Sequence, residues 1–423
     1  MNKFVQNLFL ILLPFYPIWA WLCFSLTNKS IYLFADAILL PLALYLIITV
    51  NKKLPLYLIF FIIFTFYHIG SVFITNTFPT DSNKLYYILS QPHLLACVFF
   101  IIIEHTVFDN PFIEKLNRLI FFIVILSLVV SVIQIKFPSF FFNAALDLDS
   151  GYRDGRRCAS IYSWTDLNSL GITFPILISI LASFYQKKKS SLAIIVFAGI
   201  VVSFLSKARY VMISGIVVLS QLFLNAKISA IKKASFVLML VVGIYFIVVA
   251  ANSFGYNIND VIENRILEKD NDMGSAKARI RSYEVFKVVF PENPWFGVGP
   301  ETRKKALDLL NGEVTIIHVG YLSYLYFYGI VGFSILLLSM FFLFRDTWKV
   351  GKRDNFWGIF YGLISFCLAN ITFVYFNFNE MGIVISIIYL RYFNYRSALK
   401  SLEKRIETLT IQTEETQVKY IIQ

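Results

Sequence analysis

The sequence predicts an all-α, polytopic helical membrane protein with about 12 transmembrane helices. Of its 423 residues, 58% are hydrophobic and only 15% are charged, whereas soluble domains carry about a quarter of charged residues. The mean hydropathy is +0.68. The 44 Phe and 24 Tyr residues suit lipid-facing helices with aromatic belts at the membrane surfaces. We therefore interpret residues 1–423 as a single integral membrane domain.

Apolar runs recur along almost the whole chain, each close to the length of about 20 residues that a bilayer core requires. Their approximate cores are 8–26, 31–50, 54–75, 87–107, 117–136, 166–185, 191–206, 208–225, 234–253, 319–344, 356–376 and 381–393. The first run opens like a signal peptide but lacks a small-residue cleavage site, so we expect it to be retained as a helix.

Lys and Arg in the short loops predict the orientation of the helices. If the spans alternate, one side of the membrane receives the basic segments 51–55, 186–190, 226–235, 345–355 and the start of the tail 394–423. The positive-inside rule makes this side cytoplasmic, with both termini inside and 394–423 as a cytoplasmic tail. The net charge of +12 is scattered between spans, which indicates topology rather than nucleic-acid binding.

Two longer loops fall on the opposite face, at residues 137–165 and 254–318. Between Ala251 and His318 the chain holds nine Lys and Arg residues against ten Asp and Glu residues, so the second loop is nearly neutral. Loops longer than about 15 residues are usually functional. We expect the chemistry of the protein on this extracytoplasmic side.

Arginines recur in the outer segments, against the topological bias. They include Arg157 in the first outer loop, Arg209 at a tight outer turn, and Arg279 and Arg281 in the second loop. A guanidinium group binds phosphate oxygens in pairs and keeps its charge. Contact with lipid headgroups explains any one of them equally well, but three separate sites on one face favour a shared anionic ligand.

The stretch from 275 to 301, "SAKARIRSYEVFKVVFPENPWFGVGPE", predicts a helix that ends before Pro291. Residues four apart share a helix face, so Arg279 lies beside Tyr283. Gly297 and Gly299 predict a rigid turn at which the backbone approaches another part of the protein closely.

Of the four histidines, His318 differs from the rest because it stands at the outer mouth of a span, where an imidazole can accept a proton at neutral pH. His68, His93 and His105 lie within or at the ends of spans, and we expect them to be core residues. No His, Asp and Glu cluster has the spacing of metal ligands, and the four cysteines show no disulfide framework. We therefore expect neither a metal nor another cofactor.

Four segments follow one another in an order that resembles the O-antigen ligase and Wzy-type O-antigen or capsule polymerase superfamily. They are "RRCASIYSWTDLNSLG", "SKARYVMISG", "KARIRSYEVFKVVFPENPWFGVGPE" and "HVGYLSYLYFYGIVG". The resemblance covers roughly residues 150 to 345. Its most specific parts are Arg279 before the Pro-Trp-Phe-Gly-Val-Gly turn and His318 before a Gly-x-x-Gly span, although Val319 replaces the Asn that commonly follows this histidine.

The resemblance implies a GT-C-like, metal-independent glycosyltransferase in the bacterial inner membrane that uses an undecaprenyl diphosphate-linked glycan on the periplasmic side. It implies that Arg209 and Arg279, with Arg157 and Arg281, bind the diphosphate of the donor. His318 would act on the acceptor hydroxyl, and Arg279 would also serve catalysis. It further implies membrane lipid as a partner, together with a chain-length regulator and other polysaccharide-assembly proteins.

Aromatic side chains beside these arginines suit sugar binding. Tyr283 and Trp295 would stack on sugar rings, and anchoring in the membrane interface explains them at least as well.

We interpret the protein as a polymerase that moves a growing glycan onto the next lipid-linked repeat unit of an O-antigen or capsular polysaccharide. Two alternatives stay open. One is an O-antigen ligase that transfers the glycan to lipid A–core, and the other is a flippase or transporter of lipid-linked oligosaccharides. Transporters of this size usually contain repeated halves, and the sequence shows no internal repeat.

Overall fold

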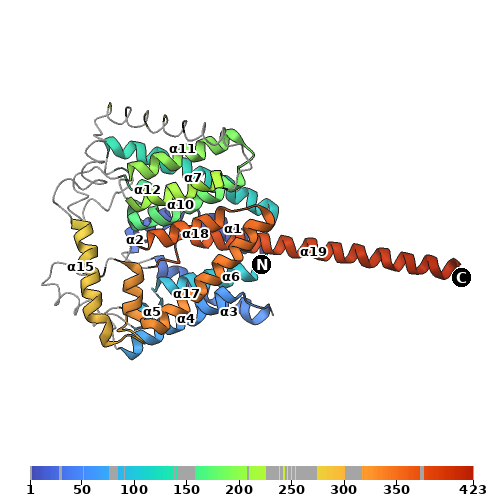
Figure 1. The fold of residues 1–423 in the computed structure, drawn as a ribbon, viewed down its shortest axis with the longest axis horizontal. Coiled ribbons are helices and arrows are strands. Elements are labelled where there is room, and N and C mark those ends of the chain that lie inside the picture. The colour runs from blue at the N-terminus through green and yellow to red at the C-terminus, as the bar shows by residue number, and fades with distance from the viewer. Residues whose placement is uncertain are drawn as a thin grey trace.

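The structure is a computed structural model, and it describes most of the chain (Figure 1). The described residues are 2–27, 31–50, 52–75, 84–89, 91–137, 140, 158–206, 209–224, 274–300, 317, 319–371 and 376–422, together with helical positions at 238, 242, 245, 249 and 253. Every regular element in these residues is a helix, in agreement with the all-α prediction. The outer loops 137–165 and 254–318 lie largely outside the described residues.

The elements follow the predicted spans closely at most boundaries. They are α1 (Asn2–Leu12), α2 (Tyr16–Thr27), α3 (Ile31–Thr49), α4 (Leu56–Ile74), α5 (Lys84–Leu89), α6 (Pro92–His105), α7 (Asn110–Lys136), η1 (Ser160–Thr165), α10 (Asp166–Phe184), α11 (Lys189–Leu205), α12 (Arg209–Leu224), α15 (Gly274–Val289), η3 (Phe290–Glu292), α17 (Gly320–Asp354), α18 (Gly358–Ala369) and α19 (Met381–Ile422).

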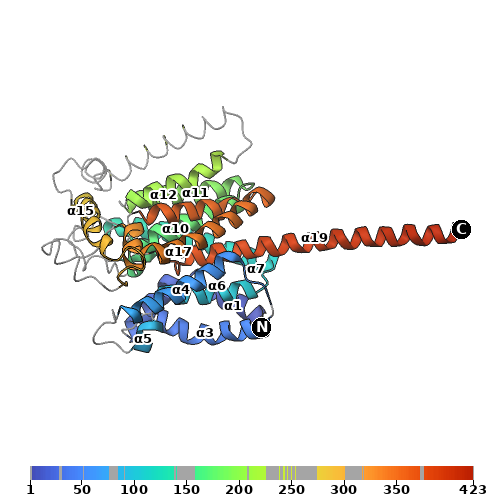
Figure 2. The same ribbon diagram turned by 60° about the horizontal axis from the view of Figure 1, so that its bottom comes forward.

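Most helices lie in one bundle, in which α4 packs along α17 and α10 packs along α18. Figures 1 and 2 show α15 across one end of this bundle, where α12 and α17 begin, while the second half of α19 projects from the opposite end. The N-terminus lies at the same end as the projecting helix. We call these the α15 end and the α19 end. Both ends of the chain thus lie at the α19 end, and α15 lies at the other.

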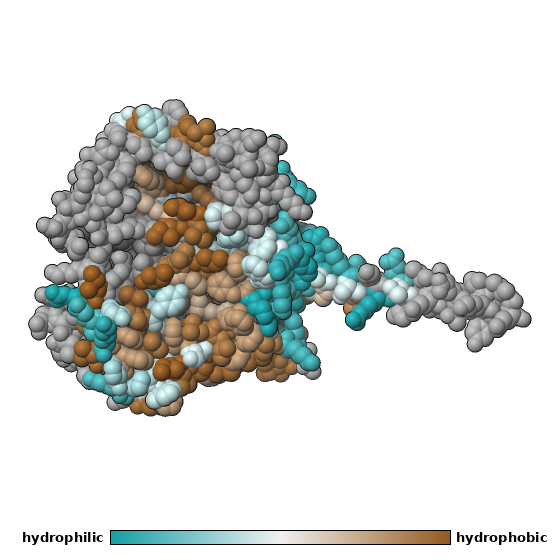
Figure 3. All heavy atoms as spheres, in the orientation of Figure 1, coloured by the Kyte–Doolittle hydropathy of each residue, from teal (hydrophilic) through white to brown (hydrophobic). Residues whose placement is uncertain are grey.

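The surface and the helix lengths agree with a membrane protein. On the face that Figure 3 shows, the described surface in the middle of the bundle is mostly apolar, and hydrophilic residues gather on α15 and where α19 leaves the bundle. Three described helices are long and apolar enough to cross a bilayer, namely α4, α7 and α17, and a fourth span results if α1 and α2 are counted together. The number of about 12 spans and the GT-C-like fold therefore stay predictions.

Some predicted spans differ in the structure. The run 8–26 is wrong as a single helix, because α1 and α2 are bent by 76° at a break after Leu12. Pro14 lies at this break and lacks the backbone N–H that a continuing helix needs. The run 87–107 is also divided, into α5 and α6.

The last two long helices extend beyond the predicted spans. The final span continues without a break into the predicted tail, so α19 has 42 residues. The helix α17 reaches Asp354, and Asn355 in the left-handed conformation ends it.

A charged cluster closes the α19 end of the bundle. Glu104 at the end of α6 is almost fully buried and accepts a hydrogen bond of 2.8 Å from the Tyr57 hydroxyl. Its second carboxylate oxygen lies 3.3 Å from Lys52 Nζ and 3.9 Å from Arg391 Nε. Burial lowers the pKa of Lys52 from its usual 10.5, and the Glu104 carboxylate offsets only part of this effect. One carboxylate therefore joins α4, α6, α19 and the loop before α4.

We expect Glu104→Ala to lower the free energy of unfolding by about 2–3 kcal/mol, because it removes the buried negative charge that is paired with two cations and the acceptor of the buried Tyr57 hydroxyl. Unfolding of the purified protein in detergent micelles measures this loss. The exposed Glu403 on α19 provides a matched control, and Glu403→Ala should change stability by less than about 0.5 kcal/mol. Equal losses in the two variants would contradict the role of the cluster.

Candidate functional site

The helix α17 is interrupted at Gly329, which has φ 64° and ψ −174°. In a continuous helix the N–H of Ile330 would bond to the carbonyl of Tyr326, and the N–H of Val331 to that of Phe327. The interruption separates both pairs, so two N–H and two carbonyl groups within an apolar helix need other partners.

The loop of residues 294–299 supplies all four partners. Its backbone inserts beside the kink and makes the hydrogen bonds Ile330 N–H to Pro294 O (2.8 Å), Val331 N–H to Trp295 O (3.0 Å), Val298 N–H to Tyr326 O (3.2 Å) and Gly299 N–H to Phe327 O (2.9 Å). We call residues 294–299 and 326–331 together the loop–kink junction. These four bonds attach residues 294–299 to α17 through the main chain.

Two glycines permit this close approach. Gly297 has φ 73°, and a Cβ at this position would overlap the carbonyl group of Phe327. A Cβ on Gly329 would in turn overlap the carbonyl group of Trp295. Both positions require glycine for conformation and for space. The rigid turn predicted from Gly297 and Gly299 is confirmed, and the surface it approaches is the backbone of α17.

The junction also sets the position of α15. This helix ends at Val289, and the single turn η3 with Pro291 leads directly into the loop, as the sequence predicted. Val285 and Val289 are buried, and the rings of Phe286 and Phe290 stack with centroids 4.8 Å apart. A short apolar stripe and the covalent link to the junction thus hold α15 across the end of the bundle.

The predicted binding residues fall partly within the described region. Arg279 lies in α15 and Arg209 is the first residue of α12, but their side chains are outside the described part of the structure, as are Arg157 and His318 altogether. The Arg281 side chain is half-buried on α15. The roles of all four arginines and of His318 stay predictions.

The two predicted sugar-binding aromatics are accessible. The exposed fractions of Tyr283 and Trp295 are 51% and 62%. Lys287 Nζ lies 4.5 Å from the centroid of the Tyr283 ring, one helical turn further along α15. Their exposure is compatible with stacking on a sugar and with anchoring at the interface.

A backbone contact connects two of the basic segments. The N–H of Cys158 donates a hydrogen bond of 3.2 Å to the carbonyl of Leu205 at the end of α11. In the sequence, Cys158 directly follows Arg157, and Leu205 precedes Arg209 by four residues. The fold thus joins the end of the first outer loop to the turn between α11 and α12.

Sequence reasoning missed a polar network inside the α15 end. His68 and His93 are buried as expected, but their rings lie 5.0 Å apart, on α4 and α6. Tyr328 Oη lies 2.6 Å from His68 Nδ1, and Tyr324 Oη lies 2.8 Å from His93 Nε2. Both tyrosines belong to the first part of α17. The only signal in the sequence was one histidine in each of the neighbouring predicted spans 54–75 and 87–107.

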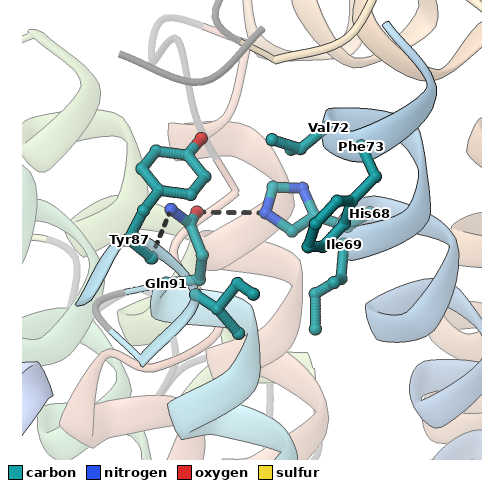
Figure 4. Close-up of a pocket in the computed structure, with 7 residues that line it drawn as sticks. His68, Ile69, Val72, Phe73, Tyr87 and Gln91 are labelled. Atoms are coloured by element: carbon teal, nitrogen blue, oxygen red, sulfur yellow. Dashed lines mark hydrogen bonds between the residues drawn. The ribbon is translucent and has the colours of Figure 1, made fainter. Parts of the chain in front are cut away.

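A narrow recess lies beside His68, between α4 and the segment from Tyr87 to Gln91 (Figure 4). It is too small to hold a water molecule, so it is no substrate site. In the part of the chain that the structure describes, no three His, Cys, Asp or Glu side chains are arranged to hold a metal ion.

The fold and this site define a helical membrane protein in which residues 294–299 are fixed by backbone hydrogen bonds to the kink in α17. Residues 174–337 match the family model described as O-antigen ligase, which confirms the family resemblance for this segment. The matched segment contains both halves of the loop–kink junction, together with α15. No curated protein matches the chain significantly.

We expect Gly297→Ala to lower the free energy of unfolding by about 2–3 kcal/mol, because alanine is strained at this φ and its methyl group meets the Phe327 carbonyl. Thermal unfolding in detergent measures the loss. Gly70→Ala on α4 is the matched control, since a methyl group there meets no atom within 4 Å. A Gly297→Ala protein that is as stable as the Gly70→Ala protein would contradict the junction.

Proposed function

We propose that the protein is a membrane glycosyltransferase that polymerises undecaprenyl diphosphate-linked repeat units into O-antigen or capsular polysaccharide. The observation that carries this proposal is the loop–kink junction within the segment that matches the O-antigen ligase family. The junction fixes α15, and with it the chain positions of Arg279 and Arg281, across one end of an apolar bundle. A fixed cationic helix at a membrane surface suits a lipid-linked diphosphate.

In the proposed reaction the nucleophile is a hydroxyl group of the acceptor and not a water molecule. The acceptor hydroxyl oxygen attacks the anomeric carbon of the donor glycan, and the bond from that carbon to the diphosphate oxygen breaks. The diphosphate keeps the electron pair, and the acceptor proton passes to His318. Arg209 and Arg279, with Arg157 and Arg281, stabilise the charge that the diphosphate gains, because prepositioned donors act strongly in a site of low polarity.

Sugar binding is assigned to the exposed aromatics next to these arginines. Tyr283 lies on α15 with Lys287 over its ring, and Trp295 lies in the loop of the junction. Their accessible faces would stack on the donor glycan and direct its reactive end toward the arginines.

The proposed orientation of the protein in the membrane follows from the distribution of Lys and Arg among the short loops. The α15 end faces the periplasm, the α19 end and both termini face the cytoplasm, and the bundle lies in the bacterial inner membrane. A GT-C-like fold, catalysis without metal, and cooperation with a chain-length regulator and other polysaccharide-assembly proteins complete the proposal.

A ligase is the second candidate, because the matching family model is itself described as O-antigen ligase. Ligase and polymerase share the same donor and differ in the acceptor, which is lipid A–core for the ligase. The segment that begins at Arg156 and leads into α10 resembles the polymerase members more closely, which favours the polymerase. Its Asn168 and Gly171, which the sequence placed at a turn, belong to the helix α10.

We expect the purified protein to lengthen a lipid-linked repeat unit in detergent without lipid A–core. Gel electrophoresis of a labelled product measures chain extension, and a parallel reaction offers lipid A–core as the only acceptor. Transfer only to lipid A–core would establish the ligase instead. A protein that forms no product with either acceptor, but moves lipid-linked glycan across vesicles, would be a transporter.

We expect Arg279→Ala to reduce the rate of glycan transfer by a factor of about 100 or more, the usual effect of removing one donor to a developing anion. Arg209→Ala and His318→Ala should also lower the rate. The length of the surface glycan in cells and the rate with purified protein measure these effects. Arg118→Ala is the control, because this exposed arginine lies on α7 beside Glu114, outside the proposed site. Full activity of a well-expressed Arg279→Ala protein would contradict the donor-binding role.

A further inference from the structure

We propose that Tyr67 and His68 of α4 are positioning residues of the transferase site, which act by holding the loop–kink junction in the geometry that donor binding needs. This inference rests on the proposed function. Both residues lie outside the segment 174–337 that matches the family, so α4 would supply a support that this segment lacks on its own.

Tyr67 contacts both halves of the junction with one hydroxyl group. Its Oη lies 2.9 Å from the carbonyl oxygen of Phe296 in the loop and 2.9 Å from that of Tyr328 in α17. The single hydroxyl hydrogen is therefore shared between the two carbonyls. Neither carbonyl takes part in the four hydrogen bonds between loop and kink, so Tyr67 adds a separate connection between them.

The glycine at position 332 of α17 leaves the space that the Tyr67 ring occupies. A Cβ on Gly332 would lie 2.9 Å from Cδ1 of Tyr67 and still closer to Cε1. Only glycine leaves this space, so the ring packs directly against the backbone of α17, one turn beyond the kink. The Gly-x-x-Gly pattern thus has two separate uses: Gly329 forms the kink, and Gly332 admits the side chain that holds it.

His68 fixes the side chain of Tyr328 from the neighbouring position. The Gln91 amide nitrogen donates to the carbonyl of Tyr87 (3.1 Å), so its oxygen must be the atom that faces His68 Nε2 at 3.0 Å (Figure 4). An amide oxygen only accepts, and His68 Nε2 must therefore carry a hydrogen. In the neutral ring Nδ1 is then an acceptor, and the Tyr328 hydroxyl donates to it over 2.6 Å.

These contacts hold the junction at the α15 end, where α4 reaches loop and kink together. Each of the two α4 residues bonds to Tyr328, one to its carbonyl and one to its hydroxyl. The loop connects through η3 to α15 and its arginines. A shift of about 1 Å in a positioning element can cost a factor of about 100 in rate. Loss of the Tyr67 hydroxyl should therefore weaken donor binding without unfolding the bundle.

The test compares Tyr67→Phe with Tyr57→Phe in the purified full-length protein. Both substitutions remove one hydroxyl from α4, but Tyr57 bonds to Glu104 at the opposite end. Hydrogen–deuterium exchange reports on the amides of residues 295–299 and 328–331, and steady-state kinetics give KM for the lipid-linked donor and kcat. Gly332→Ala, which displaces the Tyr67 ring, is a second variant.

We expect Tyr67→Phe to speed amide exchange in the junction by about five- to tenfold, the effect of losing one hydrogen bond. The donor KM should rise several-fold, Gly332→Ala should act in the same direction, and Tyr57→Phe should leave both quantities unchanged. A merely structural role would lower the yield of folded protein without a change in KM.

Unchanged exchange or unchanged KM in an active Tyr67→Phe protein would overturn this inference alone. A wild-type protein that transfers no glycan to any acceptor would contradict the proposed function, and this inference with it.

Discussion

Backbone N–H and carbonyl groups inside an apolar helix must have hydrogen-bond partners, and this requirement organises the α15 end of the protein. The break at Gly329 removes two helical hydrogen bonds from α17, and the loop 294–299 replaces them with four. Neither element satisfies its backbone in this way without the other. The kink in α17 is therefore the place where residues 294–299 attach to the bundle, and the position of α15 follows from this attachment.

The two ends of the bundle use charge differently. At the α19 end, the buried Glu104 carboxylate holds Lys52 and Arg391 in ion pairs, so these cations serve the fold. At the α15 end, the junction consists of neutral backbone bonds and depends on no charged side chain for its four connections. These four backbone connections are thus made without the cationic side chains of α15. An attachment made by neutral backbone bonds suits a site whose positive charge must act on a ligand.

Much of the fold could be predicted from hydropathy, since most boundaries of the predicted spans in the described residues lie within a few residues of a helix end. Helix breaks at proline could not be predicted in this way. Pro14 lies at a helix break, whereas α3 and α10 continue through Pro41 and Pro175. Local sequence does not tell these cases apart, because neighbouring helices decide whether a freed carbonyl finds a partner. The turn at Gly297 was predictable from local chemistry. Tyr67 was not, because its bond to the loop joins residues 229 positions apart and no periodicity reports such a pairing.

On α15, the residues that pack against the bundle and the residues that are accessible lie on different faces of the helix. Val285 and Val289 face the bundle, while Tyr283 and Val288 face outward, so one helix carries both an attachment stripe and an accessible stripe. Substitutions on the outward stripe would change what the helix touches without disturbing the loop–kink junction, because no junction bond involves a side chain of α15. A membrane enzyme built in this way could accept a different glycan by changing exposed side chains on α15 alone. Under the proposed function, the fixed backbone of the junction would keep the donor diphosphate in the same place for each glycan.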